Sequence, residues 1–530
     1  MQSGKAVRPF LDGPWLATAS YKGSLQPWVL RLPRWVRHWL LRRLLKIDRL
    51  PNDTYDALVK LADAAPGLLG ALRAEECQAI VFKGDGLACW RDYLPAGCVQ
   101  LPYTPHAAVP EPETQGLVTE ALRLKRQQPY KVLLDLRWME LGQAGGIEQA
   151  TYELVCAISA LDRRNSYRVF APRSACTDWD FPAGFGVQRH YSDPVSRQFE
   201  VAHAMTVNQL AQSLGKPAVL TPQMRTLAMM RRLDFDLVHS VAGYTALDWD
   251  GCATVLTMND LQHLHYPGFF TPEDWAHREQ VYRKSAENAK HIICISEFTR
   301  QDVHKQYGIA LEKMSTVWIV PSRNVWWPLS EAARAKLLAG MQLDAGTPFF
   351  FFPAHCWPHK NHARLIEAFA RVASALPAGT QLVMTGRPLP PEHPAAVLMR
   401  EHNLARRVVH LGYRSPLEVR ALFQGCMALV LPSLFEGFGM PVAEALVAGK
   451  PVLCSNVTAL PELVGDAALM FDPLDVDAMA NSLLTMASDA ALRATLSAAA
   501  IRRRPLFSAE RIARQTMAVY QRVHEAHYGQ

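Results

Sequence analysis

Long hydrophobic runs are missing from this sequence of 530 residues, although 49% of its residues are hydrophobic. No stretch approaches the roughly 18 uncharged apolar residues of a membrane-spanning helix, and the first residues contain no hydrophobic core of a secretion signal. The 10 cysteines include no CxxC pair and follow no regular spacing, which argues against metal ligation and a disulfide framework. We therefore expect a globular protein of the reducing cytoplasm.

Net positive charge is nearly absent outside one segment. The formal net charge is +7, and Pro27–Leu50 contains seven basic residues and one acidic residue, Asp48. Because the rest of the chain is nearly neutral, we expect no nucleic-acid partner.

A basic amphipathic helix is predicted at Pro33–Asp48. Apolar residues, including Trp35 and Trp39, recur there at helical spacing, and basic residues lie largely off that stripe. Such a helix can lie in a membrane interface, which would hold the protein on the inner face of the cytoplasmic membrane. The alternative is a helix that docks on a neighbouring domain with its basic face in water. We favour the membrane surface.

The length predicts two or three domains. From residue 129 onwards apolar strands alternate with helical patterns, which is typical of an α/β fold with doubly wound parallel sheets. We divide the chain into an N-terminal extension (1–128), a first domain (129–330), a second domain (331–505) and a final helix (506–530). The predicted strands are Ala79–Lys83, Cys98–Leu101, Lys131–Leu136, Tyr167–Ala171, Leu237–Ser240, Ala253–Met258, Ile292–Glu297, Pro348–Pro353, Gln381–Thr385, Val408–Leu411 and Cys426–Leu431.

The most informative stretch is Leu431–Gly449, which reads LPSLFEGFGMPVAEALVAG. A buried strand leads into a glycine-bracketed loop that carries Glu436, and Pro441 then opens a helix with Glu444 one turn inside it. Free amides at the helix start can bind an anion, and the two carboxylates can accept hydrogen bonds from hydroxyls. A nucleotide sugar offers both kinds of group. The alternative is an ordinary strand–loop–helix unit with solvated acids.

This stretch resembles the signature of the retaining GT-B glycosyltransferases of the glycogen-synthase-like group 1 type, in which seven residues separate the two glutamates. The match continues through Gly449–Val452 and Ala459–Glu462. The resemblance implies two Rossmann-like domains that face a cleft, with the final helix crossing back to the first domain. It implies that Glu444 binds the nucleotide ribose and that Glu436 holds the hydroxyls of the transferred sugar, with Gly437, Phe438 and Gly439 also at the donor.

Two further positions are assigned to the donor. Gly145 and Gly146 lie between a strand and a helix, as in a phosphate-facing turn, and they resemble the glycine loop of the family's first domain. Lys360 lies at a strand–helix turn, where the resemblance implies a contact with the donor diphosphate. The family usually has an arginine five or six residues earlier. Here those positions hold His355 and Ala354, so one cation is absent or His355 supplies it.

Glu436 and Lys360 are catalytic candidates as well as donor-binding residues, and the first domain supplies the other catalytic candidates. His239 ends a predicted strand, and Asp260 follows another, together with Asn259 where the family usually has histidine. An amide cannot act as a titrating base, so a catalytic role at Asn259 is in doubt. His263 and His265 stay open as either structural or chemical residues.

We expect no metal and no other cofactor. The Asp-x-Asp triplets of the chain do not follow convincing strands in the way that a metal-bound diphosphate would require. These triplets are Asp178–Asp180, Asp234–Asp236, Asp248–Asp250 and Asp475–Asp477.

The function expected from the resemblance is that of a retaining, metal-independent hexosyltransferase. Its donor would be a nucleotide sugar, with GDP-mannose as a candidate, and its acceptor a saccharide or a lipid-linked glycan of bacterial surface polysaccharide such as O-antigen lipopolysaccharide. The first alternative is a non-catalytic, nucleotide-binding assembly protein of a polysaccharide machine, and the second is a sugar-nucleotide epimerase.

Overall fold

The computed structural model describes residues 79–83, 99–103, 129–136, 146–172, 187–192, 235–241, 243, 253–344 and 346–527. The predicted helix at Pro33–Asp48 and the candidate donor residue Gly145 lie outside these ranges. Within the N-terminal extension, β1 (Ala79–Lys83) and β2 (Val99–Tyr103) form a parallel pair.

The first domain is built on a parallel sheet whose seven described strands have the order β5-β4-β3-β6-β7-β8-β9. Because all pairings are parallel, the carboxyl ends of the central strands meet at one edge, where ligands gather in open α/β sheets. The strands are β3 (Lys131–Asp135), β4 (Ser166–Pro172), β5 (Val187–Ser192), β6 (Leu237–Ser240), β7 (Ala253–Met258), β8 (His291–Cys294) and β9 (Met314–Thr316). The helices described with them are α7 (Gly146–Leu161), α10 (Gln262–His265), α11 (Pro272–Asn288) and α12 (Glu297–Tyr307).

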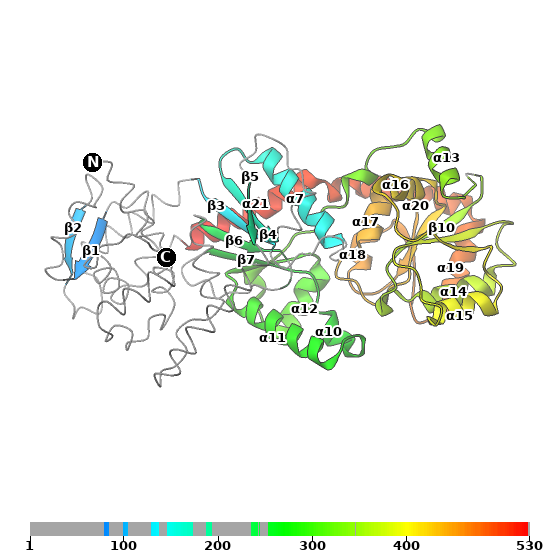
Figure 1. Cartoon of the computed structure of the whole chain (residues 1–530), viewed down its shortest axis with the longest axis horizontal. Coiled ribbons are helices and arrows are strands. Elements are labelled where there is room, and N and C mark those ends of the chain that lie inside the picture. Colours follow the sequence, from blue (N-terminus) through cyan, green and yellow to red (C-terminus); the bar gives the residue numbers. More distant parts are fainter. Residues whose placement is uncertain are drawn as a thin grey trace.

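The second domain contains a six-stranded parallel sheet of order β12-β11-β10-β13-β14-β15. The strands are β10 (Phe349–Pro353), β11 (Gln381–Thr385), β12 (Val408–His410), β13 (Ala428–Leu431), β14 (Val452–Ser455) and β15 (Ala468–Phe471). Its helices are α13 (Glu331–Gly340), α14 (His362–Val372), α15 (Pro394–Glu401), α16 (Pro416–Gly425), α17 (Met440–Val447), α18 (Leu460–Val464), α19 (Val476–Ser488) and α20 (Ala490–Arg503). Two parallel doubly wound domains confirm the predicted α/β fold class, and they lie side by side along the long axis of Figure 1.

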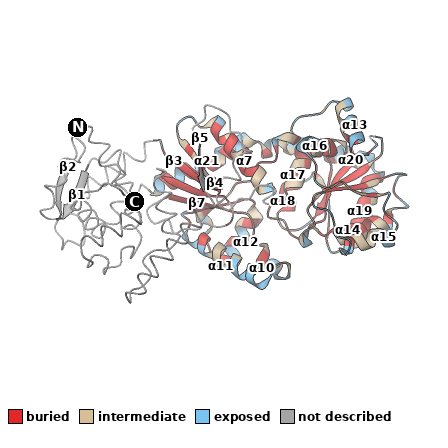
Figure 2. Cartoon of the chain, in the orientation of Figure 1, coloured by how far each residue is buried: buried red, intermediate tan, exposed pale blue. Residues whose placement is uncertain are grey.

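Each sheet is buried between layers of helices, as the red interiors in Figure 2 show. Strand β10 illustrates why the apolar runs become central strands, because Phe349, Phe350, Phe351 and Phe352 are all at most 2% exposed. In strand β8 the prediction was too long. The strand ends at Cys294, and Ser296 instead caps α12 by accepting a hydrogen bond from the amide of Thr299 at 3.0 Å.

The first passage of the chain between the domains lies between β9 and α13, and the second passage lies between α20 and α21 (Ala509–His527). The two passages are in contact with each other. Trp318 of the first passage stacks on Phe507 of the second, with ring centroids 5.1 Å apart. Helix α21 then returns to the first domain, where Ile512 and Val519 join its apolar core. In Figure 1 this helix is the red ribbon that lies against the strands of the first domain.

In the described part of the chain, no helix combines the length and hydrophobicity needed to cross a bilayer.

Candidate donor site between the two domains

The loop between β13 and α17 places Glu436 in a buried polar cluster. Its carboxylate oxygen Oε1 accepts hydrogen bonds from Lys360 Nζ and from Ser433 Oγ, each at 2.6 Å. The side chains of Lys360 and Glu436 are only 15% and 10% exposed. Two of the candidate residues, which are 76 positions apart in the sequence, therefore form one ion pair.

The charge state of Glu436 follows from this cluster. Burial by itself would raise the pKa of the carboxyl group, but the positive charge of Lys360, the neighbouring His359 and the hydrogen bonds from Lys360 and Ser433 outweigh burial and hold the pKa below its usual range. Glu436 is therefore ionised at neutral pH. An ionised carboxylate can accept hydrogen bonds from sugar hydroxyls.

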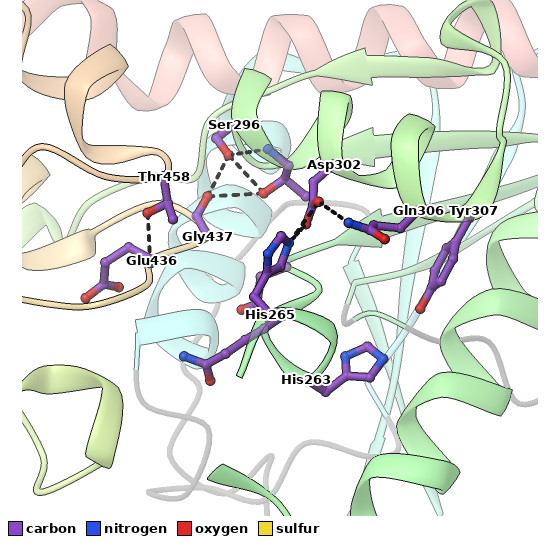
Figure 3. Close-up of polar contacts among 12 residues, drawn as sticks. His263, His265, Ser296, Asp302, Gln306, Tyr307, Glu436, Gly437 and Thr458 are labelled. Carbon is purple, nitrogen blue, oxygen red and sulfur yellow. Dashed lines mark hydrogen bonds and ion pairs between the residues drawn. The ribbon is translucent and has the colours of Figure 1, made fainter. Parts of the chain in front are cut away.

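The backbone around Glu436 is held from both sides. Its amide donates to Thr458 Oγ1 at 3.1 Å, and Thr458 itself has a φ of 53°. The carbonyl of the next residue, Gly437, accepts a hydrogen bond from Ser296 Oγ of the first domain at 2.6 Å (Figure 3). A Cβ atom at Gly437 would lie 2.2 Å from the carbonyl oxygen of Asn259. Gly437 is thus needed for close contact between the domains.

Gly439 is needed for the turn into α17. Its φ is 104°, and a Cβ atom there would lie 2.6 Å from Leu460 Cδ2. The side chain of Phe438 is 3% exposed and packs in the apolar core, so only its backbone is available to a ligand. A Cβ atom at Gly146, the first residue of α7, would lie 3.5 Å from Met440 Cβ at the start of α17. The amino ends of these two helices therefore converge.

Glu444 lies in the second turn of α17 and is partly buried. Burial raises the pKa of its carboxyl group to about 7, and a hydrogen bond from the backbone of Ser322 opposes this shift only in part. Ser322 belongs to the first passage between the domains. The carboxyl group of Glu444 therefore changes between its protonated and its ionised form near neutral pH. The ionised form can accept hydrogen bonds from ribose hydroxyls.

Asp260 lies across from Glu436 at the carboxyl end of β7. Its Oδ1 accepts a hydrogen bond from the amide of Gln262, the first residue of α10, at 3.0 Å. Burial is the main cause that raises the pKa of Asp260, and the negative charge of Glu436 raises it further, against the opposing effects of the Gln262 amide and the positive charge of Arg278. The charge of Glu436, in the donor loop between β13 and α17, therefore affects the protonation of Asp260.

His239, a catalytic candidate from the sequence, is buried in the first domain. Its two ring nitrogens form hydrogen bonds of 2.7 Å with Tyr520 Oη and Thr257 Oγ1, and the residue is 1% exposed. Burial lowers its pKa to about 3, so the ring is neutral. His239 thus links Tyr520 of α21 to Thr257 of β7, and its catalytic role stays a prediction.

The other two histidines of the first domain also have protein partners. His263 Nε2 lies 3.2 Å from Glu279 Oε2 in the interior. His265 Nε2 contacts both carboxylate oxygens of Asp302 at 2.8 and 2.9 Å, and its ring lies 5.2 Å from that of Phe435, next to Glu436. Of the two, only His265 borders the donor loop (Figure 3).

Several residues of this site were not singled out from the sequence. Ser296 and Thr458 fix the backbone at Glu436, and Glu462 accepts the amides of Glu297 at 2.9 Å and Phe298 at 3.2 Å across the domain boundary. A serine just before a helical pattern could have been recognised as a cap. The long-range partners could not, because only folding brings them within reach.

One Asp-x-Asp triplet is fully described, and capping and ion pairing account for it. Asp475 caps α19 by accepting the amide of Ala478 at 2.9 Å, and Asp477 pairs with Arg371. Of the other triplets only Asp236 is described, and its Oδ2 accepts the amide of Lys131. Within the described ranges, no three His, Cys, Asp or Glu side chains form a group that could hold a metal ion.

Family models match both domains. The model described as "Glycosyl transferases group 1" matches residues 334–503, and that described as "Glycosyltransferase Family 4" matches residues 144–318.

Curated relatives are similar at modest identity. O-antigen chain mannosyltransferase B of Escherichia coli is 28% identical over 266 residues, which are 50% of this chain and 69% of the relative. MMP alpha-(1->4)-mannosyltransferase of Mycolicibacterium hassiacum is 26% identical over 252 residues, which are 47% of this chain and only 58% of the relative.

The solved structure of HepE from Anabaena, in complex with UDP and glucose, matches with a TM-score of 0.55 at 18% identity. The match covers 74% of this chain and 100% of that one, and at this identity it shows the fold alone. Because glycosyltransferase family models match both domains, the chain belongs to the group 1 glycosyltransferase family, and it has the two-domain GT-B fold.

Proposed function

We propose that this protein transfers a hexose, with retention of anomeric configuration, from a nucleoside-diphosphate sugar to a saccharide or lipid-linked glycan of bacterial surface polysaccharide. The observation that carries the proposal is the buried Lys360–Glu436 pair beside the converging amino ends of α7 and α17. GDP-mannose is the proposed donor. Its support comes from the relatives, of which one is named an O-antigen mannosyltransferase and another a mannosyltransferase.

The proposed reaction replaces the diphosphate oxygen at the anomeric carbon by an acceptor oxygen. Negative charge builds on the leaving diphosphate, and the free amides at the start of α17, together with Lys360, are placed to stabilise it. Glu436 holds the hydroxyls of the sugar, and Glu444 holds the ribose. Because the helix amides and a lysine supply this positive charge, we propose that transfer needs no divalent metal.

Closure of the two domains supports the proposal. The hydrogen bonds from Ser296 to Gly437 and from the α12 amides to Glu462 of α18 hold the second domain against the first, which would carry the acceptor. A closed cleft excludes water and limits hydrolysis of the donor.

The proposed membrane contact rests on the sequence of Pro33–Asp48. Deleting Pro27–Leu50 should release the protein from vesicles that contain anionic lipid and should spare turnover of a water-soluble acceptor. Vesicle binding that survives the deletion would contradict the contact.

The test of function is a panel of nucleotide sugars, read first by thermal stabilisation and then by transfer to mannose-containing acceptors. A ligand at 100 times its Kd stabilises the folded protein by about 2.7 kcal/mol, so a true donor should stand out clearly. GDP-mannose is expected to give both signals, also in the presence of EDTA. Stabilisation by no nucleotide sugar would contradict the proposal.

A non-catalytic assembly role is the second candidate, because Asn259 and Ala354 stand where the family usually has a histidine and an arginine. Glu436→Ala distinguishes the two functions. Full polysaccharide assembly in a strain that carries this variant would favour the assembly role, and loss of assembly with retained protein level would favour the transferase.

A further inference from the structure

The missing family arginine leaves a gap in positive charge at the proposed diphosphate site. Ala354 cannot fill it, because its side chain is 8% exposed and belongs to the apolar core of the second domain. The loop after β11 also passes close to this position, since a Cβ atom at Gly386 would lie 2.7 Å from the carbonyl oxygen of Ala354. The charge must therefore come from another residue.

His355 cannot supply the charge at neutral pH. Its Nδ1 accepts a hydrogen bond from the backbone amide of Arg387 at 3.3 Å, so the ring proton is on Nε2. Burial, and then the positive charges of Arg387 and Lys360, lower the pKa of His355. A neutral His355 can donate one hydrogen bond but brings no charge to an anion.

Lys360 alone does not give the site a net positive charge. Its ammonium group is 2.6 Å from the ionised carboxylate of Glu436, so the pair as a unit is neutral. A diphosphate carries at least two negative charges, and a neutral pair compensates neither. A second cation at this edge of the sheet would resolve the imbalance.

Arg387 is placed to be that cation. It follows β11, whose last residue, Thr385, is in register with the last residue of β10, Pro353, so the loops after both strands leave the sheet side by side. The residue is exposed, and its guanidinium group forms no ion pair with any residue in the described ranges. Its charge and that of Lys360 both act on His355, which lies in the loop between β10 and Lys360. Arg387 therefore lies in a loop that contacts His355 directly, through the hydrogen bond from its amide to Nδ1, at the same edge of the sheet as the loop that leads to Lys360.

We propose that Arg387 is the second cation of the diphosphate site, binding a phosphate group of a nucleoside diphosphate in place of the arginine that the family carries beside β10. The inference rests on the proposed function, because it deepens the donor site described above. Arginine suits this position since its planar guanidinium group can donate two parallel hydrogen bonds to a phosphate.

The test compares binding of GDP, UDP and guanosine by isothermal titration calorimetry to the full chain and to Arg387→Gln, Arg387→Lys and Arg406→Gln. Arg406 is the matched control, an exposed arginine two residues before β12 and therefore on the side of the sheet where the strands begin, whereas Arg387 follows the carboxyl end of the neighbouring strand β11. Arg387→Gln is expected to weaken the better-bound diphosphate by about tenfold, the lower end of the range for a hydrogen bond to a charged group. Arg387→Lys should restore part of this loss, and Arg406→Gln should bind like the unaltered protein.

The outcomes separate the inference from the proposed function. Unchanged diphosphate affinity in Arg387→Gln, with a loss in Lys360→Ala, would overturn the role of Arg387 and leave the donor site intact. An equal loss for guanosine, which has no phosphate, would place Arg387 on the base and would also overturn the inference. If neither GDP nor UDP binds to the unaltered protein, the proposed function falls together with the inference.

Discussion

Replacing Lys360 by methionine tests how strongly the buried pair is coupled. Lys360→Met leaves the carboxylate of Glu436, which is 10% exposed, with the hydroxyl of Ser433 as its remaining side-chain donor. Removing one member of a fully buried pair costs about 3–5 kcal/mol, whereas an exposed pair contributes about 0.2–1 kcal/mol. With side chains 15% and 10% exposed, we expect a cost of about 2–3 kcal/mol at pH 7.

The double variant Lys360→Met/Glu436→Gln isolates the interaction. Because it removes both charges, it should cost about 1 kcal/mol or less, which is about 1–2 kcal/mol less than Lys360→Met alone, and the coupling energy in the double-mutant cycle should be at least that large. The measurement is urea denaturation of the four proteins, followed by circular dichroism and by fluorescence. Since a chain with two domains need not unfold in one step, the midpoint of the same transition is compared in all four.

The pH dependence gives a second test of the same pair. The pKa of Glu436 lies below its usual value of 4.5, so its contribution to stability is present above pH 4.5 and is lost as the pH falls through the lower, folded-state pKa. In Lys360→Met burial dominates, and the pKa of Glu436 should lie above 4.5 instead, so this variant should lose stability as the pH rises towards 7. The difference between the two proteins should therefore shrink as the pH is lowered from 7 to 4.5. A cost below about 0.5 kcal/mol at pH 7, with a coupling energy near zero, would refute the reasoning.

Three further predictions concern the rest of the site. Burial raises the pKa of Glu444 from 4.5 to about 7, so between these two pH values the folded state binds a proton that the unfolded state does not. The unaltered protein should therefore lose stability as the pH rises from 4.5 to 7, and Glu444→Gln should not. Urea denaturation measures this, and equal pH profiles for the two proteins would contradict the raised pKa. Gly437→Ala places a Cβ atom 2.2 Å from the carbonyl oxygen of Asn259, so the two domains must move apart. Small-angle scattering should show a larger radius of gyration, and turnover should fall about 100-fold. An unchanged radius of gyration would contradict the close contact between the domains. His239→Gln should lower the free energy of unfolding by about 1–3 kcal/mol, because it loses hydrogen bonds to Tyr520 and Thr257, and it should leave kcat unchanged. A large decrease in kcat without a loss of stability would instead support a catalytic role for His239.

The central strands could be predicted because each signal is local. Leu237–Ser240, Ala253–Met258 and Gln381–Thr385 are apolar runs bounded by polar or turn residues, and the structure has strands with these same bounds. Strand β8 was predicted too long, because the run IICISE continues the apolar pattern past Cys294 into a residue, Ser296, that caps the next helix. A cap competes with a strand for the same residue, and the sequence pattern alone does not decide between them.

By itself, the sequence determined the two parallel sheets, the loop with Glu436 and the helix whose first turn contains Pro441, since apolar periodicity, glycine and proline act over a few residues. Only the tertiary structure decided the partners of that loop. It pairs Lys360 with Glu436 and sets Ser296 of the other domain on Gly437, across 76 and 141 residues of chain. The physical reason is that hydrogen bonds and ion pairs depend on distances of a few ångströms in space, and no local pattern encodes which distant residues folding will bring that close.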